Sequence, residues 1–110
     1  MSAATKKRRA LVFARACSRC ECGCGRFISE ETGRLDHFFG RGKVPEALSN
    51  CWALHLECDE AKTRNVPSGA HWARRFGYHA QKHGFYAESE ACAARVQVLV
   101  AKGRANGGGR

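Results

Sequence analysis

Four cysteines fall within eight positions near the start of the chain. The segment C-S-R-C-E-C-G-C contains Cys17, Cys20, Cys22 and Cys24, and glycines stand at positions 23 and 25. The chain has seven cysteines, an odd number that disulfides cannot pair completely. The apolar stretch LVFARAC is too short for a secretory signal peptide, and disulfides persist mainly in exported proteins. Clustered thiols are therefore expected to bind a metal ion.

A second pair of ligand candidates lies further along the chain, at His55 and Cys58. Zinc accepts thiolate and imidazole ligands in tetrahedral sites, so this pair is expected to complete a structural zinc site with the clustered cysteines. Three ligand sets are open. Cys17 and Cys20 join His55 and Cys58, or Cys20 and Cys24 join the same pair, or three clustered cysteines join Cys58 without His55. Cys20 and Cys58 belong to all three sets.

Acidic, amide and imidazole side chains follow at spacings suited to hydrolytic chemistry. Asp36 and His37 are adjacent, Asn50 comes thirteen positions after His37, and Asp59 opens the segment D-E-A-K-T. A neutral histidine near pH 7 can take a proton from water. Carboxylates are ligands of hard cations such as Mg²⁺. Each residue alone is weak evidence, so the prediction depends on their order and spacing together.

In that order and spacing, residues 17 to 65 resemble the HNH endonuclease family. The family pattern has a Cys pair, an Asp-His or His-His at the end of the first strand, and then an Asn. A second Cys pair follows and runs into a final His and a helix of the Lys-Thr type. The chain matches this pattern at Asp36, His37, Asn50, Cys58, Lys62 and Thr63. It departs at two positions: His55 replaces the usual first cysteine of the second pair, and Asp59 replaces the usual final histidine.

The resemblance implies an α+β fold, a small zinc-stapled ββα-metal (His-Me finger) core with additional C-terminal helices. It implies that His37 is the general base and that Asn50 fixes the His37 ring. Asp36 and Asp59 would hold one catalytic cation, Mg²⁺ or Mn²⁺, and the zinc would be structural. Contacts to DNA phosphates are expected from Lys62, Arg64, Arg41 and Lys43.

The implied function is that of a freestanding nuclease of the phage or bacterial type, which cuts DNA in the cytoplasm with little sequence preference. Two hypotheses come from other classes of protein. One is a catalytically weak zinc-containing DNA-binding module, because Asp59 replaces the family's final histidine. The other is a thiol-based redox or metal-storage protein, although no thioredoxin-like pattern surrounds the clustered cysteines.

Net charge and its placement point to the same kind of partner. The 110-residue chain carries a net charge of +9. Residues 1 to 26 contribute +6, the segment from Lys102 onward contributes +3, and the remainder is balanced. Basic ends indicate a polyanionic partner such as DNA. No run of 18 or more apolar residues is present, so we expect no membrane partner. We also expect no small-molecule organic cofactor, and we expect a monomer.

The pattern of apolar and turn residues predicts one folded domain over residues 10 to 102. A flexible basic arm over 1 to 9 and a flexible Gly-rich tail over 103 to 110 flank it. Strands are expected to begin near Phe27, over 34 to 39, and around Trp52 and Leu54, while residues 10 to 16 fit either a short helix or a strand. Helices are predicted over 59 to 64, from a cap at Ser68 toward Gly84, and over 88 to 102.

Overall fold

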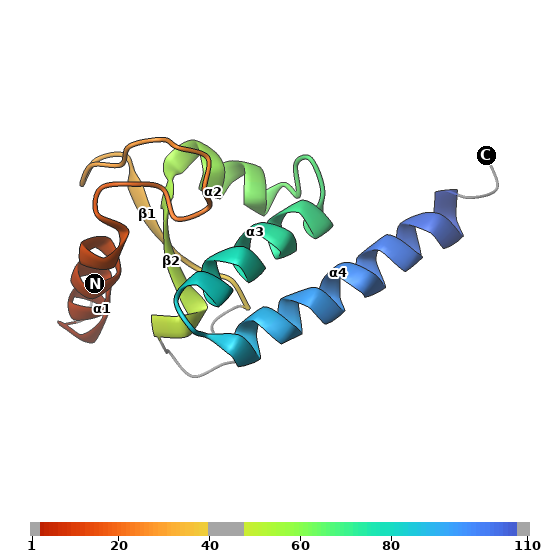
Figure 1. Ribbon diagram of the computed structural model, residues 1–110. Helices are drawn as coiled ribbons and strands as arrows, with labels where there is room; N and C mark the ends of the chain where they lie inside the picture. Colours follow the sequence, from red (N-terminus) through yellow and green to blue (C-terminus); the bar gives the residue numbers. More distant parts are fainter. Residues whose placement is uncertain (1–2, 40–47, 108–110) are drawn as a thin grey trace. The chain divides into compact units, whose positions relative to one another are not determined.

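The computed structural model describes residues 3–39 and 48–107, with side chains over 6–39 and 48–103. Over these ranges the fold is mixed α+β, with four helices and a two-stranded antiparallel sheet. One folded domain is predicted from the sequence, and the chain forms two compact units, Met1–Glu60 and Ala61–Arg110. The first unit holds α1 (Ala3–Ala16), β1 (Gly33–His37), the 3-10 turn η1 (Leu48–Asn50), β2 (Cys51–His55) and the start of α2 (Leu56–Thr63) (Figure 1).

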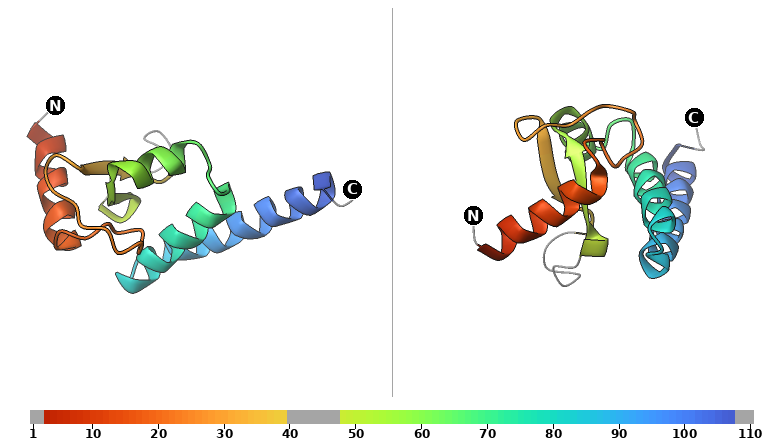
Figure 2. Two further views of the ribbon diagram at one scale, coloured as in Figure 1. Left: turned by 90° about the horizontal axis from the view of Figure 1, so that it is seen from above. Right: turned by 60° about the vertical axis from the view of Figure 1, so that its left-hand side comes forward.

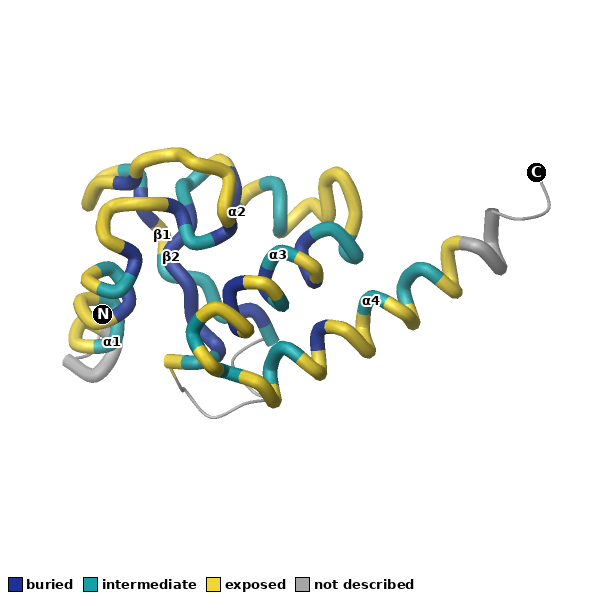
Figure 3. The backbone as a smooth tube through the Cα atoms, in the orientation of Figure 1, coloured by how far each residue is buried: buried dark blue, intermediate teal, exposed yellow. Residues whose placement is uncertain are grey.

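The sheet of the first unit is a hairpin of two short strands. β1 and β2 pair antiparallel, with Asp36 opposite Trp52 and His37 opposite Cys51. The first four residues of β2 are fully buried, so this strand runs through the core of the unit (Figure 3). The strands predicted over 34 to 39 and around Trp52 are confirmed. The third predicted strand is not formed, because Phe27 makes only an isolated bridge.

Helix α1 begins where the sequence predicts a flexible arm over residues 1 to 9. Ala, Lys, Arg and Leu make up much of the helix, and these residues have high helix propensity. The helix also packs, since Val12 is fully buried and the Arg9 guanidinium lies 4.1 Å from the centroid of the Phe13 ring. Propensity and packing together explain why this basic segment is ordered as a helix.

Arg15 connects α1 to the following loop and to β2. Its guanidinium forms a bidentate ion pair with Glu21, with N–O distances of 2.8 and 2.9 Å. It also donates to the backbone carbonyls of Leu48 and Cys51, at 3.1 and 2.6 Å. Glu21 accepts a further hydrogen bond from the amide of Ala53 on β2 at 2.9 Å. Because the Glu21 side chain is only 5% exposed, Arg15 has a structural role and does not belong to a mobile basic arm.

The second unit contains a helical hairpin of α3 (Gly69–Lys82) and α4 (Tyr86–Gly107). α3 starts at the predicted cap, where the Ser68 hydroxyl accepts a hydrogen bond from the His71 amide at 3.1 Å. Its apolar side chains recur at helical spacing and are buried, among them Trp72 and Phe76. The two helices lie side by side and run in opposite directions (Figure 1 and Figure 2). Gly84, with φ of +78°, permits the tight turn between them.

Helix α4 is longer than the helix predicted over 88 to 102. It begins at Tyr86 and continues to Gly107, so the predicted flexible tail is helical up to that residue. Arg104 and Ala105 are strong helix formers and extend the helix past Lys102. Residues 108–110 lie outside the described residues. In the described part of the chain, no helix combines the length and the hydropathy that crossing a membrane requires.

Candidate metal centre and hydrolytic site

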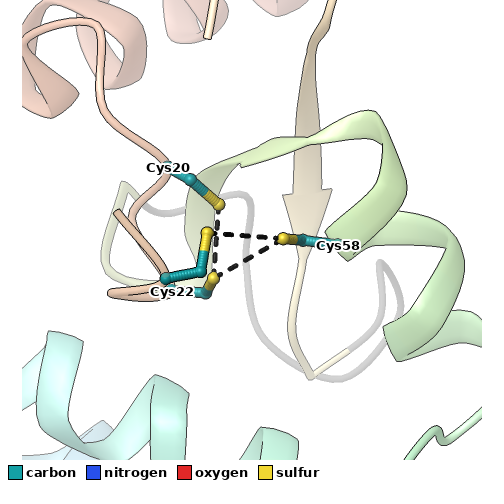
Figure 4. A group of neighbouring side chains, drawn as sticks. Cys20, Cys22 and Cys58 are labelled. Atoms are coloured by element: carbon teal, nitrogen blue, oxygen red, sulfur yellow. Dashed lines mark hydrogen bonds between the residues drawn. The ribbon is translucent and has the colours of Figure 1, made fainter. Parts of the chain in front are cut away.

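Four cysteines of the first unit bring their sulfur atoms together; we call them the cysteine cluster. The Sγ atoms of Cys20, Cys22, Cys24 and Cys58 all lie within 4.8 Å of one another. The Sγ–Sγ distances are 3.3 Å for Cys20–Cys22, 3.8 Å for Cys22–Cys58 and 3.6 Å for Cys24–Cys58. Figure 4 shows the side chains of Cys20, Cys22 and Cys58 turned toward one another. A tetrahedral zinc with Zn–S bonds of about 2.3 Å needs sulfur–sulfur distances of about 3.8 Å, so the cluster is compatible with zinc.

The three N-terminal sulfurs of the cluster lie on one tight loop. Gly23 and Gly25 alternate with the cysteines and have φ angles of +88° and +86°, a region that favours glycine. The amide of Cys20 donates to the carbonyl of Arg26 at 2.9 Å and closes the loop. Cys58 lies near the start of α2. A metal ion bound by all four sulfurs would therefore join this loop to α2.

N–H groups surround the sulfur atoms of the cluster. The amide of His55 donates to Cys20 Sγ at 3.3 Å, and the amide of Arg26 donates to Cys24 Sγ at 3.5 Å. The Arg26 guanidinium donates to Cys58 Sγ at 3.3 Å. Four thiolates around one Zn²⁺ leave an excess of negative charge. These donors would stabilise that charge, and the guanidinium would do so most strongly because it is itself charged.

The pKa values of the cluster thiols differ because the thiols share hydrogen bonds in a partly buried place. Donation from the Cys22 thiol, assisted by the His55 amide, lowers the pKa of Cys20 to about 5, against the opposing effect of burial. The same hydrogen bond to Cys20, together with burial, raises the pKa of Cys22. Burial and the neighbouring Cys20 raise the pKa of Cys58 to about 11. At neutral pH, Cys22 and Cys58 keep their protons until a metal ion displaces them.

Of the three ligand sets that the sequence leaves open, the structure brings together the set of three clustered cysteines with Cys58. Cys17 lies outside the cluster; it is exposed, and its thiol faces the Ala14 carbonyl at 3.6 Å. His55 also lies outside the cluster. Its Nδ1 atom accepts a hydrogen bond from the Glu57 amide at 3.1 Å.

Cys22 belongs to the cluster, but it is in neither of the cysteine pairs that the sequence analysis names as zinc ligands. The common C-x-x-C spacing draws attention to Cys17 and Cys20 instead. The signal for Cys22 is the alternation of cysteine with other residues from position 20 to 24. Glycines at positions 23 and 25 let this segment turn tightly, so three closely spaced thiols can face one ion.

The acidic and imidazole residues of the predicted hydrolytic site come from the hairpin and α2. Asp36 and His37 end β1, and Asp59 lies in the first turn of α2. The Asp36 carboxylate accepts a hydrogen bond from the indole N–H of the buried Trp52 at 2.8 Å. The Nε2 atom of His37 is buried. Among the described side chains, Asp36, His37 and Asp59 do not form a three-donor group of the kind that the cysteines form.

Asn50 is fully buried and holds the chain directly after His37. Its backbone carbonyl accepts a hydrogen bond from the Phe38 amide at 2.9 Å. Its side-chain carbonyl accepts one from the Phe39 amide at 2.8 Å. The sequence predicts that Asn50 fixes the His37 ring, and the contacts described are to the two backbone amides that follow His37.

The predicted phosphate-binding residues lie partly in undescribed segments. Lys62 is in the last turn of α2 and is half-buried, and Arg64 follows α2 and is exposed. Arg41 and Lys43 lie outside the described residues. Of the predicted phosphate-binding residues that the structure describes, Arg64 is thus the exposed one.

Comparison with known proteins finds no relative: no protein-family model, curated protein or solved structure matches the chain. The chain is therefore assigned to no family. The residues and distances of the two candidate sites are the basis for a functional proposal.

Proposed function

We propose that the protein is a metal-dependent DNA endonuclease of the HNH type, in which a structural zinc at the cysteine cluster supports the catalytic residues. The observation that carries the proposal is the order β1–β2–α2. β1 ends at Asp36 and His37, and β2 leads directly into the helix that bears Cys58 and Asp59. A hairpin followed by a helix supports the ββα-metal arrangement that the sequence predicts, in which zinc at the cysteine cluster would join the helix to the loop.

The cysteine cluster supports this proposal by its position as well as by its distances. Cys58 is the residue before Asp59 on α2. Zinc held by the cluster would fix the first turn of α2 and, with it, the backbone that carries the Asp59 carboxylate. Metal sites need such support, because a ligand that moves by about 1 Å loses much of its function.

His37 would act as the general base. A neutral imidazole near pH 7 can accept a proton from the attacking water. Asn50 holds the backbone that follows His37 through the Phe38 and Phe39 amides. Both contacts restrain the backbone that directly follows His37.

Asp36 and Asp59 would hold one hard divalent cation, Mg²⁺ or Mn²⁺, with water and phosphate oxygens in its remaining positions. The indole N–H of Trp52 restrains the Asp36 carboxylate. When bound, such a cation neutralises the scissile phosphate and stabilises the leaving oxygen. Lys62 and Arg64 would contact neighbouring phosphates, which carry no sequence information, so little sequence preference is expected.

A plasmid-nicking assay tests this proposal. Zinc-loaded wild type, His37→Ala and the control His71→Ala, which replaces a histidine on α3, are incubated with supercoiled plasmid and Mg²⁺ or Mn²⁺. Wild type and His71→Ala are expected to nick, and His37→Ala is expected to be slower by about 100-fold or more. Equal nicking by His37→Ala at equal zinc content would remove His37 from the mechanism. No nicking by wild type with either ion would reject the nuclease.

A zinc-containing DNA-binding module without turnover is the second candidate. The buried Nε2 atom of His37 favours it, because burial separates that nitrogen from bulk water. This candidate predicts that wild-type protein binds DNA and leaves the plasmid supercoiled with both ions.

A further inference from the structure

The second unit carries most of the positive charge of the chain. Residues 61–110 contain nine Lys and Arg side chains against two Glu, a net charge of +7 out of the total of +9. Residues 1–60 are nearly balanced, with ten basic against eight acidic side chains. Partial burial, followed by the nearby guanidinium groups of Arg75 and Arg74, lowers the pKa of His71 on α3. Six of these basic side chains and both Glu lie within α3 and α4, a net charge of +4, so the helical hairpin has a positive potential of its own.

A groove of about 350 Å³ lies between α3 and α4. Arg74, Tyr78 and Gln81 line it from α3, at spacings of four and three residues that place them on one face of the helix. Gln97 lines it from α4. Among the described residues that line the groove, none is acidic. The groove is thus bordered by hydrogen-bond donors, with Arg74 as the charged lining residue and Glu88 beside the groove on α4, where its charge acts on Cys92.

The groove has two chemically different parts. At its rim, Arg74 is exposed and Tyr78 is 69% exposed, and both side chains can donate to phosphate oxygens. Lys82 is exposed and comes directly after the lining residues of α3. Its floor is apolar, where Ala73 and Cys92 are buried. An anionic chain with apolar segments between its charges fits a groove of this kind, and the sugar–phosphate backbone of DNA has that composition.

We propose that this groove, which we call the hairpin groove, is a DNA-binding surface that holds the phosphodiester backbone of duplex DNA through Arg74, Tyr78, Gln81 and Gln97, with Lys82 beside it. The inference rests on the proposed function only for the choice of DNA as the nucleic acid. Donors that face phosphates bind without regard to sequence. The basic surface therefore supplies affinity, and the hydrolytic site of the first unit supplies the chemistry.

The test is the salt dependence of DNA binding by the full-length, zinc-loaded protein. Fluorescence anisotropy of a labelled 20-base-pair duplex is measured between 50 and 200 mM salt, without added Mg²⁺ or Mn²⁺. The Arg74→Gln/Lys82→Gln variant is expected to reduce the slope of log K against log salt by about 1.8, or about 0.9 for each phosphate that the protein no longer neutralises. Over this salt range, wild type would then lose about 12-fold more affinity than the variant.

Lys6→Gln/Lys7→Gln is the matched control, because it removes the same charge from exposed positions on α1 of the first unit. This control is expected to reduce the slope by less than Arg74→Gln/Lys82→Gln does, because neither lysine lines the hairpin groove. The charge-conserving variant Arg74→Lys/Lys82→Arg is expected to restore the slope, which separates charge from folding. A wild-type slope in Arg74→Gln/Lys82→Gln, or an equal reduction in both neutralised variants, would overturn the inference. Tighter binding of a single-stranded RNA through the same residues would overturn the choice of duplex DNA.

The failure of this inference and the failure of the proposed function have different outcomes. His37→Ala is expected to bind the duplex with the wild-type slope. If the neutralised groove variant loses slope while wild type never nicks plasmid, the hairpin groove stands and the nuclease fails. If wild type nicks and the groove variant keeps its slope, the nuclease stands and the groove fails.

Discussion

Replacing Asn50 with alanine removes a buried hydrogen-bond acceptor that holds the backbone two residues after His37. The Asn50 side chain is fully buried, and its carbonyl accepts from the Phe39 amide at 2.8 Å. The backbone hydrogen bond from Phe38 to the Asn50 carbonyl remains in the variant. Loss of one buried hydrogen-bond partner costs about 1–3 kcal/mol. Since 1 kcal/mol lowers the Tm of a small domain by about 4–8 °C, the expected fall in Tm is about 4–24 °C.

The same substitution is expected to slow nicking, because the backbone that carries His37 loses one of its restraints. Misplacement of a catalytic group by about 1 Å can cost about 100-fold in rate. Thermal unfolding followed by circular dichroism gives the Tm, and plasmid nicking well below that Tm gives the rate. Zinc content is expected to stay at the wild-type value, since Asn50 is not part of the cysteine cluster.

Ser49→Ala is the matched control, because Ser49 is the preceding residue in η1 and is only half-buried. It is expected to change the Tm by little and to leave nicking unchanged. Wild-type stability in Asn50→Ala would refute the role of its side chain in holding the segment after His37. If Asn50→Ala shows the expected fall in Tm but nicks plasmid at the wild-type rate, the position of the segment after His37 does not affect catalysis.

Four further predictions concern the cysteines of both units and the core of the first unit. In zinc-loaded protein, iodoacetamide is expected to alkylate Cys17 but to spare Cys24, although both are exposed; mass spectrometry compares the two rates, and equal rates would contradict zinc ligation. Cys92, whose pKa burial raises to about 11, is expected to react only after unfolding. Zinc uptake at pH 7 is expected to release at least two protons, because Cys22 and Cys58 have raised pKa values and are protonated at this pH. Since protons compete with zinc for these sulfur atoms, zinc affinity is expected to fall as the pH falls. Calorimetry in two buffers of different ionisation enthalpy counts these protons, and a count of zero would contradict the assignment. Arg15→Met removes the guanidinium that faces the buried Glu21 carboxylate and is expected to lower the free energy of unfolding by about 3–5 kcal/mol in a urea titration; an unchanged urea midpoint would show that the ion pair is not structural.

Local signals in the sequence were sufficient for the strands and the helical hairpin. The apolar residues around Trp52 predict a buried strand, and β2 runs from Cys51 to His55. The Ser68 cap and the periodic apolar residues that follow predict α3, and both features are found. These elements are decided by side-chain periodicity and by capping, which act over a few residues.

The N-terminal helix and the choice of zinc ligands depend on contacts between distant residues. Arg9 donates to the carbonyls of Glu30 and Gly33, more than 20 positions away, at 3.4 and 3.5 Å. No local pattern contains that information, so composition alone predicts a mobile arm. Likewise, the sulfur atoms of Cys22 and Cys58 meet across 36 positions because the loop folds onto α2. The spacing of zinc ligands within one segment, such as C-x-x-C or H-x-x-C, pairs Cys17 with Cys20 and His55 with Cys58. It contains no information on which sulfur atoms of distant segments meet.

Anomalous X-ray scattering from crystals grown with Mn²⁺ tests the central claim most directly. Data at the zinc and manganese edges locate each metal separately. We expect one zinc with Zn–S distances of about 2.3 Å to Cys20, Cys22, Cys24 and Cys58, and one manganese bound by Asp36 and Asp59 near His37. A zinc with other ligands, or two carboxylates that face apart with no manganese between them, would contradict the account.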